Sequence, residues 1–202
     1  MKLKRNFWLV YPADSSSEPL IIHHKSKNGL IEVRPEYRHL CCGSCGKLDV
    51  REALRSHVPG DMRLRLKRDL ASSFEGLELV SDRLGDLLRG FPGSEIEYFS
   101  FPKPTGYSIA IPRRAIVPSE GDPGFVVSRR CDECGRFRSA IWDSDKPFLL
   151  EPVVTAVFEL QNSIGTMPIW VVSDELLRHI KSASPRITGL CVNPDDQISM
   201  VE

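Results

Sequence analysis

The sequence predicts an α+β fold in one domain that spans residues 1–202. Of these residues, 41% are hydrophobic and 27% are charged, as in globular chains that bury a core. Two segments have the pattern of a strand that runs into a capped helix. Two short cysteine motifs, 89 positions apart, add a link between distant parts of the chain. Together these observations predict mixed strands and helices held by a long-range tie.

The first strand–helix segment begins with the apolar run at 79–80, which leads into Ser81. A serine side chain can accept hydrogen bonds from the first free N–H groups of a helix. Asp82 follows, where the positive end of the helix dipole favours an acid. The pattern predicts a strand that ends at Ser81, a helix to Arg89 and a return strand over 96–101.

The same order of residues recurs around Ser173 and predicts a second strand, a helix over 174–181 and a return strand over 187–192. Cys42 and Cys131 lie 89 positions apart, and the two capping serines lie 92 positions apart. We therefore hypothesise two degenerate repeats of about 100 residues, with halves 1–100 and 101–202. Chance similarity between two capped helices is the simpler alternative.

Other elements follow from local patterns. A capping box at 49–52 predicts a short helix that reaches about His57. Apolar and basic residues alternate over 62–67, which is the period of a strand with one basic face. The apolar segments 126–127 and 137–142 flank the second cysteine motif, and we expect them to form the hairpin that carries it.

The cysteines carry the most specific signal in the sequence. Four of the six form two copies of Cys-x-x-Cys-Gly. Two thiolates three positions apart can bind one face of a tetrahedral ion, and the glycine that follows can adopt a positive φ. Two such knuckles complete a four-sulfur shell, so the sequence predicts structural Zn²⁺ bound by Cys42, Cys45, Cys131 and Cys134.

This zinc ribbon is split, because the 85 residues at 46–130 lie between its two knuckles. A cross-link over so long a loop restricts the unfolded chain strongly. A redox-active pair and ordinary disulfides are the alternatives. A redox pair needs only one motif, and disulfides are disfavoured in a chain without an evident export signal. Cys41 lacks the knuckle spacing, and we expect Cys191 to be a small core residue.

Several classes of function are disfavoured. A closed shell of four thiolates leaves no position for water, and the sequence contains none of the common motifs for nucleophilic catalysis, metalloproteases or phosphate-binding loops. We therefore expect a protein that is not an enzyme. No apolar run reaches the roughly 18–20 residues that cross a bilayer, so we expect no membrane association and a cytoplasmic location.

Charge is balanced overall but unevenly distributed. Lys plus Arg and Asp plus Glu both total 27, whereas residues 1–70 hold 14 basic and 8 acidic side chains, a surplus of +6. The remaining residues are acidic, and an acidic surface could steer a basic protein partner; its candidate residues are Asp174, Glu175, Asp195 and Asp196. Arginines beside the second knuckle could instead contact phosphates, although acids at 132–133 oppose this; these arginines are Arg129, Arg130, Arg136 and Arg138.

The two knuckles, their long insert and the two Val-Ser-Asp-x-Leu helices resemble the double-CxxCG motif family of bacterial proteins, over residues 30–192. That family is similar to, and partly overlaps, immunity proteins of polymorphic toxin systems. The resemblance implies that the four knuckle cysteines are metal ligands. It also implies a non-catalytic, zinc-stabilised immunity protein that binds and neutralises a cognate bacterial toxin. The alternative is a zinc-ribbon protein associated with nucleic acid or with regulation.

Overall fold

The computed structural model describes most of the chain, namely residues 4–12, 19–62, 64, 66–116, 125–127, 130–136, 140–142, 148–149, 154–161, 168–183, 185–192 and 197–201. Strands dominate these residues and the helices are short, so the predicted α+β class is confirmed. Within the described ranges, no helix has the length and apolar character needed to cross a membrane.

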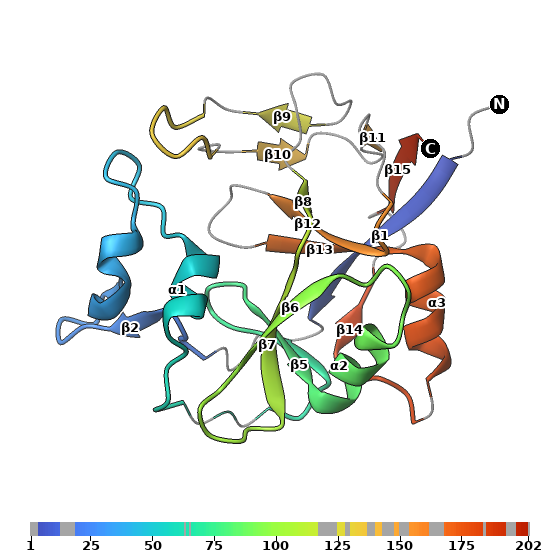
Figure 1. Cartoon of the computed structure of the whole chain (residues 1–202), viewed down its shortest axis with the longest axis horizontal. Coiled ribbons are helices and arrows are strands. Elements are labelled where there is room, and N and C mark those ends of the chain that lie inside the picture. The colour runs from blue at the N-terminus through green and yellow to red at the C-terminus, as the bar shows by residue number, and fades with distance from the viewer. Residues whose placement is uncertain are drawn as a thin grey trace.

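The described strands form two main sheets and two hairpins (Figure 1). The smaller sheet has the order β4-β5-β7-β6 and consists of β4 (Leu70–Ser72), β5 (Glu78–Ser81), β7 (Tyr107–Pro112) and β6 (Ile96–Ser100). All its neighbouring strands are antiparallel. The hairpins pair β2 (His23–Lys25) with β3 (Ile31–Val33), and β9 (Phe125–Val127) with β10 (Ala140–Trp142).

The larger sheet has the order β11-β15-β1-β13-β12-β8, and β14 also pairs with β1. Its strands are β11 (Phe148–Leu149), β15 (Gln197–Val201), β1 (Lys4–Pro12), β13 (Pro168–Ser173), β12 (Val157–Gln161), β8 (Ala115–Ile116) and β14 (Leu190–Cys191). The N-terminal strand β1 is therefore internal to a sheet made otherwise from the second half of the chain. The first and last described strands lie side by side, since Lys4 on β1 pairs with Val201 on β15 (Figure 1).

Both predicted capped helices are confirmed. The Ser81 hydroxyl accepts a hydrogen bond from the Leu84 N–H at 3.2 Å, and α2 (Asp82–Arg89) follows. The Ser173 hydroxyl accepts one from the Leu176 N–H, also at 3.2 Å, and α3 (Asp174–Ser182) follows. Serine at these positions satisfies N–H groups that a helix leaves unpaired at its start.

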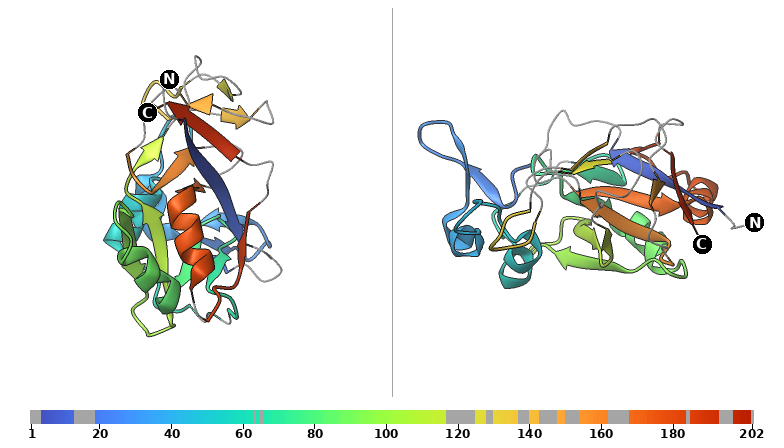
Figure 2. Two further views of the ribbon diagram at one scale, coloured as in Figure 1. Left: turned by 90° about the vertical axis from the view of Figure 1, so that its right-hand side faces the viewer. Right: turned by 90° about the horizontal axis from the view of Figure 1, so that it is seen from above.

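Helices α2 and α3 meet in one hydrophobic core. Each contributes two turns of buried leucine or isoleucine to it, and β5 and β13 contribute valines next to the caps. The members at matching places are Val80, Leu84 and Leu88 in one unit, and Val172, Leu176 and Ile180 in the other. Figure 2 shows the two helices on the same side of the molecule. Two further cores cover the remaining faces of the two sheets.

The local predictions were correct in part. The short helix is α1 (Val50–Ser56), with Asp49 as its cap, and the segments around the second knuckle form the β9–β10 hairpin as expected. The described residues of 62–67 do not form a strand, although Met62, Leu64 and Leu66 pack against a core as their alternation suggested. The second return strand is shorter than predicted, and Cys191 on β14 is exposed rather than part of the core.

Candidate metal centre

The two cysteine knuckles come from separate parts of the fold. The first follows a 3-10 helix, η1 (Pro35–Leu40), and precedes α1. The second lies between β9 and β10. Both have the same backbone geometry. The Gly46 N–H donates to the Cys42 carbonyl at 2.8 Å and the Gly135 N–H to the Cys131 carbonyl at 2.9 Å. The two glycines have φ of +71° and +67°, which a residue with a Cβ rarely adopts.

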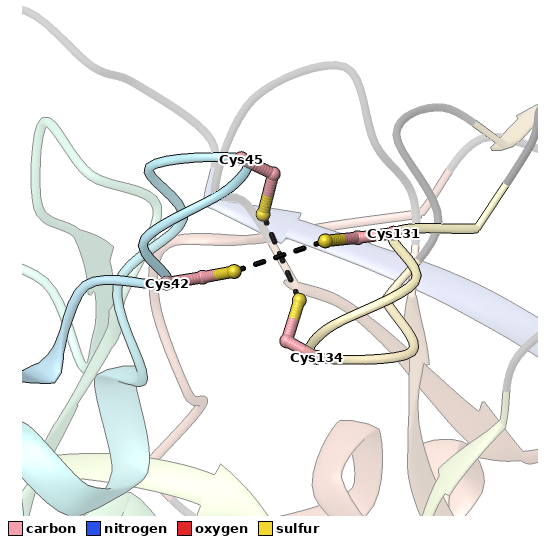
Figure 3. A group of neighbouring side chains, drawn as sticks. All are labelled: Cys42, Cys45, Cys131 and Cys134. Atoms are coloured by element: carbon pink, nitrogen blue, oxygen red, sulfur yellow. Dashed lines mark hydrogen bonds between the residues drawn. The ribbon is translucent and has the colours of Figure 1, made fainter.

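The four sulfurs meet at one point (Figure 3). Cys42 Sγ lies 3.7 Å from Cys131 Sγ, and Cys45 Sγ lies 3.6 Å from Cys134 Sγ. All four ligand atoms are within 4.8 Å of one another. Tetrahedral zinc with bonds of about 2.3 Å requires sulfurs roughly 3.8 Å apart, so the donor set fits such an ion. The predicted cluster is confirmed as a set of four neighbouring cysteines.

Backbone amides turn toward the sulfurs. The N–H groups of Cys134 and Glu133 bond to the Cys131 sulfur and lower its pKa to about 7. The N–H groups of Cys45 and Ser44 act likewise on Cys42. Its pKa nevertheless rises to about 12, because burial and the neighbouring sulfurs of Cys45 and Cys131 favour the protonated thiol. A divalent cation would remove this conflict by stabilising thiolates that otherwise repel one another.

A carboxylate from the second knuckle closes over the tip of the first. Glu133 Oε2 accepts hydrogen bonds from the Ser44 N–H at 3.0 Å and from the Ser44 hydroxyl at 2.6 Å. These two bonds lower the pKa of Glu133 below its usual value. Gly43 lies directly beside this carboxylate: a Cβ there would be 3.5 Å from Glu133 Oε1. This acid at the tip of the second knuckle therefore joins the two knuckles.

Arg136 makes a second brace between the knuckles. Its guanidinium donates to the Leu48 carbonyl at 2.7 Å and to the Lys47 carbonyl at 3.3 Å, and it lies 3.3 Å from Asp49 Oδ2. Asp49 is also the cap of α1, where its other oxygen accepts the Glu52 N–H at 3.1 Å. The brace thus ties the second knuckle to the segment that carries the first. The sequence proximity of Arg136 to Cys134 is the only signal that could have suggested this.

The segment after the first knuckle is also held to the main sheets. Arg51 on α1 donates to the Glu159 carboxylate on β12 at 2.9 Å and to the Pro112 carbonyl at the end of β7. Burial raises the pKa of Glu159, while the Arg51 guanidinium opposes that rise. The metal centre is therefore framed by contacts to both sheets.

Other predicted residues lie away from the sulfur cluster. Cys41 is half-buried and pairs its backbone with Leu48, outside the four-sulfur group. All six cysteines are free thiols. Asp174 is half-exposed at the start of α3 and Glu175 is exposed. Arg130 is exposed as well. The remaining predicted partner or phosphate contacts lie outside the described residues, namely Asp195, Asp196, Arg129 and Arg138.

Among the described residues, the four knuckle cysteines are the only group of three or more side chains arranged to hold a metal ion. With all four positions taken by sulfur, such an ion has no place for water or substrate. The geometry suits a metal that stabilises the fold. Comparison with known protein families, curated proteins and solved structures finds no match to this chain.

Proposed function

We propose that the chain is a zinc-stabilised binding protein, and that Cys42, Cys45, Cys131 and Cys134 bind one structural Zn²⁺. The observation that carries the proposal is the convergence of four sulfurs from two knuckles 89 positions apart, at the spacing of a tetrahedral ion. Thiolate ligands favour zinc and other thiophilic metals over magnesium or calcium. Six free cysteines suit a reducing compartment, in line with the expected cytoplasmic location.

The partner we propose is a cognate bacterial toxin, which the chain neutralises as an immunity protein. The support is the resemblance of the two knuckles and the two capped helices to the double-CxxCG family. A metal site with four protein ligands is consistent with stoichiometric binding, because the ion has no open position for chemistry. A protein of this kind acts through its surface.

The start of α3 is the proposed contact surface. Asp174 and Glu175 lie in the first turn of α3, and Glu175 points into solvent. Asp174 also has internal bonds, since it accepts from Trp8 Nε1 at 3.1 Å and from Arg178 Nε at 3.1 Å. Glu175 is therefore the better residue for a test of binding, because its replacement leaves those bonds in place.

The test begins with the metal and then the partner. The protein purified under reducing conditions should contain one zinc per chain by elemental analysis, and a tagged chain should retain a toxin from its native host as a 1:1 complex. With that toxin, Glu175→Lys should lower the association rate by about tenfold at low salt. Glu36→Lys, the same charge change on exposed η1, is the matched control. If the protein contains zinc but retains no toxin, the metal site is supported and the immunity role is refuted.

A zinc-ribbon protein associated with nucleic acid is the second candidate. Arg130 is exposed beside the second knuckle and could contact phosphate. Arg136 is less suited to this, because its guanidinium already bonds two carbonyls and Asp49. Mobility-shift assays with DNA and RNA test the candidate. Affinity that falls steeply with added salt would support it, and the lack of any shift at low salt would exclude it.

A further inference from the structure

The two main sheets repeat the same arrangement of strands. The smaller sheet has the order β4-β5-β7-β6, and the larger sheet contains the order β12-β13-β1 followed by β14 and β15. Every neighbouring pair in both series is antiparallel. In each series the second strand runs directly into a capped helix, α2 or α3. The similarity therefore extends beyond the two strand–helix segments recognised in the sequence.

The pairing registers of the central strands correspond residue by residue. In the smaller sheet Leu79 faces Ile109, and Ser81 faces Tyr107. In the larger sheet β13 and β1 pair in the same register: Val171 faces Leu9, and Ser173 faces Phe7. Val171 lies 92 positions after Leu79, and Leu9 lies 100 positions before Ile109. The capping serine thus has the same cross-strand partner position in both sheets. A shift of one residue in either sheet would abolish this match.

The outer strands follow the same correspondence. Leu70 pairs with Val80 in one sheet, and Val157 pairs with Val172 in the other. At the opposite edge, the residue that faces Pro112 is Ile96. In the larger sheet the counterpart of Ile96 is Leu190 on β14, which faces Pro12 on β1. The Ser81 N–H donates to the carbonyl of residue 69 and the Ser173 N–H to that of residue 156, each at 2.8 Å. In each sheet the acceptor is the residue just before the paired one, Leu70 or Val157.

The order of the matched elements along the chain is also the same. Residues 1–103 contain β1, a knuckle, β4, β5, α2 and β6, and residues 104–202 contain β7, a knuckle, β12, β13, α3 and β14. Yet β1 lies in the sheet of the second series, and β7 lies in the sheet of the first. Each half therefore supplies its first strand to the other half.

We propose that the chain is an internal duplication whose two halves have exchanged their first strands, and that the metal centre lies on the axis that relates them. The matched sulfurs are Cys42 with Cys131, and Cys45 with Cys134. The sulfurs of these pairs lie 3.7 Å and 3.6 Å apart, and their connecting lines cross at the centre of Figure 3. A metal ion at that point joins two halves that the strands already interlock.

The exchange of strands has a mechanical consequence. The loop between the halves, around 102–104, is exposed and makes the only covalent link between residues 1–103 and 104–202. If the strands are exchanged, cutting this link should not release either half, because β1 pairs with β13, β14 and β15 of the opposite half and β7 pairs with β5 and β6 of the opposite half. The metal should then determine how tightly the cut halves hold together.

The experiment uses the full chain with a protease recognition sequence inserted between Lys103 and Pro104, folded with zinc and then cut. We expect the cut protein to elute as one particle of unchanged size, with an unfolding midpoint that now depends on protein concentration. Chelation of the metal should weaken the association of the two pieces by at least about tenfold. Separation of the pieces in native buffer with metal bound would overturn the strand exchange. An association unaffected by chelation would overturn the role of the metal.

A circular permutant tests the duplication itself. This permutant begins at residue 104 and ends at residue 103, and a short flexible linker joins residue 202 to residue 1. Because the two halves contain matched elements in the same order, the permutant keeps the natural order of elements. We expect one metal per chain and a melting temperature close to that of the natural order. A control permutant is opened between Asn28 and Gly29, inside one half. If the first permutant does not fold while the control does, the duplication is overturned. If neither permutant folds, the association of the two pieces of the cut protein decides. Neither result depends on the toxin, so the proposed function is tested separately.

Discussion

The starts of α2 and α3 have the same backbone geometry but different chemistry. Each follows a strand, and each is capped by a serine whose hydroxyl accepts an N–H three residues later at 3.2 Å. The two starts differ in what lies beneath the cap. The Ser81 N–H donates to the carbonyl of Asp69, just before β4, and the Ser173 N–H donates to that of Ala156, just before β12. One junction is charged and the other is apolar.

Asp69 is the centre of a buried polar network. It is 8% exposed and accepts the Ser81 hydroxyl at 2.7 Å, the Thr188 N–H at 2.8 Å and the Arg83 guanidinium. Burial alone would raise the pKa of Asp69, but bonds from Arg83, Thr188 and Ser81 hold it well below its usual range. Arg83 also donates to the Arg186 carbonyl at 3.1 Å. This network links α2 to the segment after α3.

Geometry and stability have separate origins at these two helix starts. The same strand, cap and helix form over a charged junction and over an alanine, so the backbone frame does not depend on the ion pair. The ion pair instead makes the α2 junction sensitive to charge, because a buried acid that loses its partners is costly. The α3 junction has no such liability among its described contacts.

The largest expected effect comes from breaking the centre that both halves share. Cys42→Ser and Cys131→Ser should each reduce bound metal from one ion per chain to none and lower the melting temperature by about 10 °C or more. The two losses should be equal, because the two cysteines occupy matching positions. Elemental analysis and thermal melting measure them. Cys41→Ser, next to a ligand but outside the cluster, is the control and should retain the metal.

The second prediction targets the charged junction. Asp69→Ala should cost about 2–3 kcal/mol of unfolding free energy, somewhat less than a fully buried ion pair because Arg83 is partly exposed. Asp86→Ala, an exposed acid on α2 that pairs with Arg89, should cost less than about 0.5 kcal/mol. Denaturant unfolding with metal bound measures both. Equal costs for the two variants would contradict the importance of the network.

The same network predicts a dependence on pH. The pKa of Asp69 is lower in the folded protein than in the unfolded chain, where an aspartate has a pKa of about 3.9. Its stabilisation is therefore complete above about pH 5 and is lost as the pH falls through and below 4. The difference in stability between the natural protein and Asp69→Asn should shrink over that range. Taking the difference removes the effect of acid on the metal site, which both proteins share.

Local chemistry explains what the sequence could predict. The knuckles, the capped helices and the β9–β10 hairpin depend on residues no more than 17 positions apart, so their patterns are visible in the chain. Two Val-Ser-Asp segments correctly gave α2 and α3, and the spacing of Cys-x-x-Cys-Gly gave the sulfur cluster. The α+β class follows from these elements.

Long-range pairing explains what the sequence could not predict. The segment that became β1 had only an apolar run to mark it, and nothing local shows that it lies between β13 and β15. The alternation over 62–67 resembled a strand, yet Met62, Leu64 and Leu66 are partly buried and pack against a core without the pairing that defines a strand. The braces from Glu133 and Arg136 likewise depend on partners about 89 positions away.

The fourth prediction concerns the asymmetry between the two knuckles. The braces come from the second knuckle, so Arg136→Ala should cost about 1–2 kcal/mol and lower metal affinity by about tenfold. Arg136→Lys keeps the charge but cannot contact two carbonyls and Asp49 with one planar group, and it should recover less than half of the loss. Zinc competition with a chromogenic chelator measures the affinity. Full recovery by lysine would show that charge alone matters.

The smallest effects sharpen the comparison of the two helix starts. Ser81→Ala and Ser173→Ala each remove a cap and should cost about 1 kcal/mol. The Ser81 variant should cost more, because its hydroxyl also donates to Asp69, whereas the residue beneath Ser173 is Ala156. In a double-mutant cycle, Ser81→Ala and Asp69→Ala should be non-additive, and Ser173→Ala with Asp69→Ala should add. Additivity in both cycles would mean that the network at α2 does not act as a unit, and that the two junctions differ only in composition.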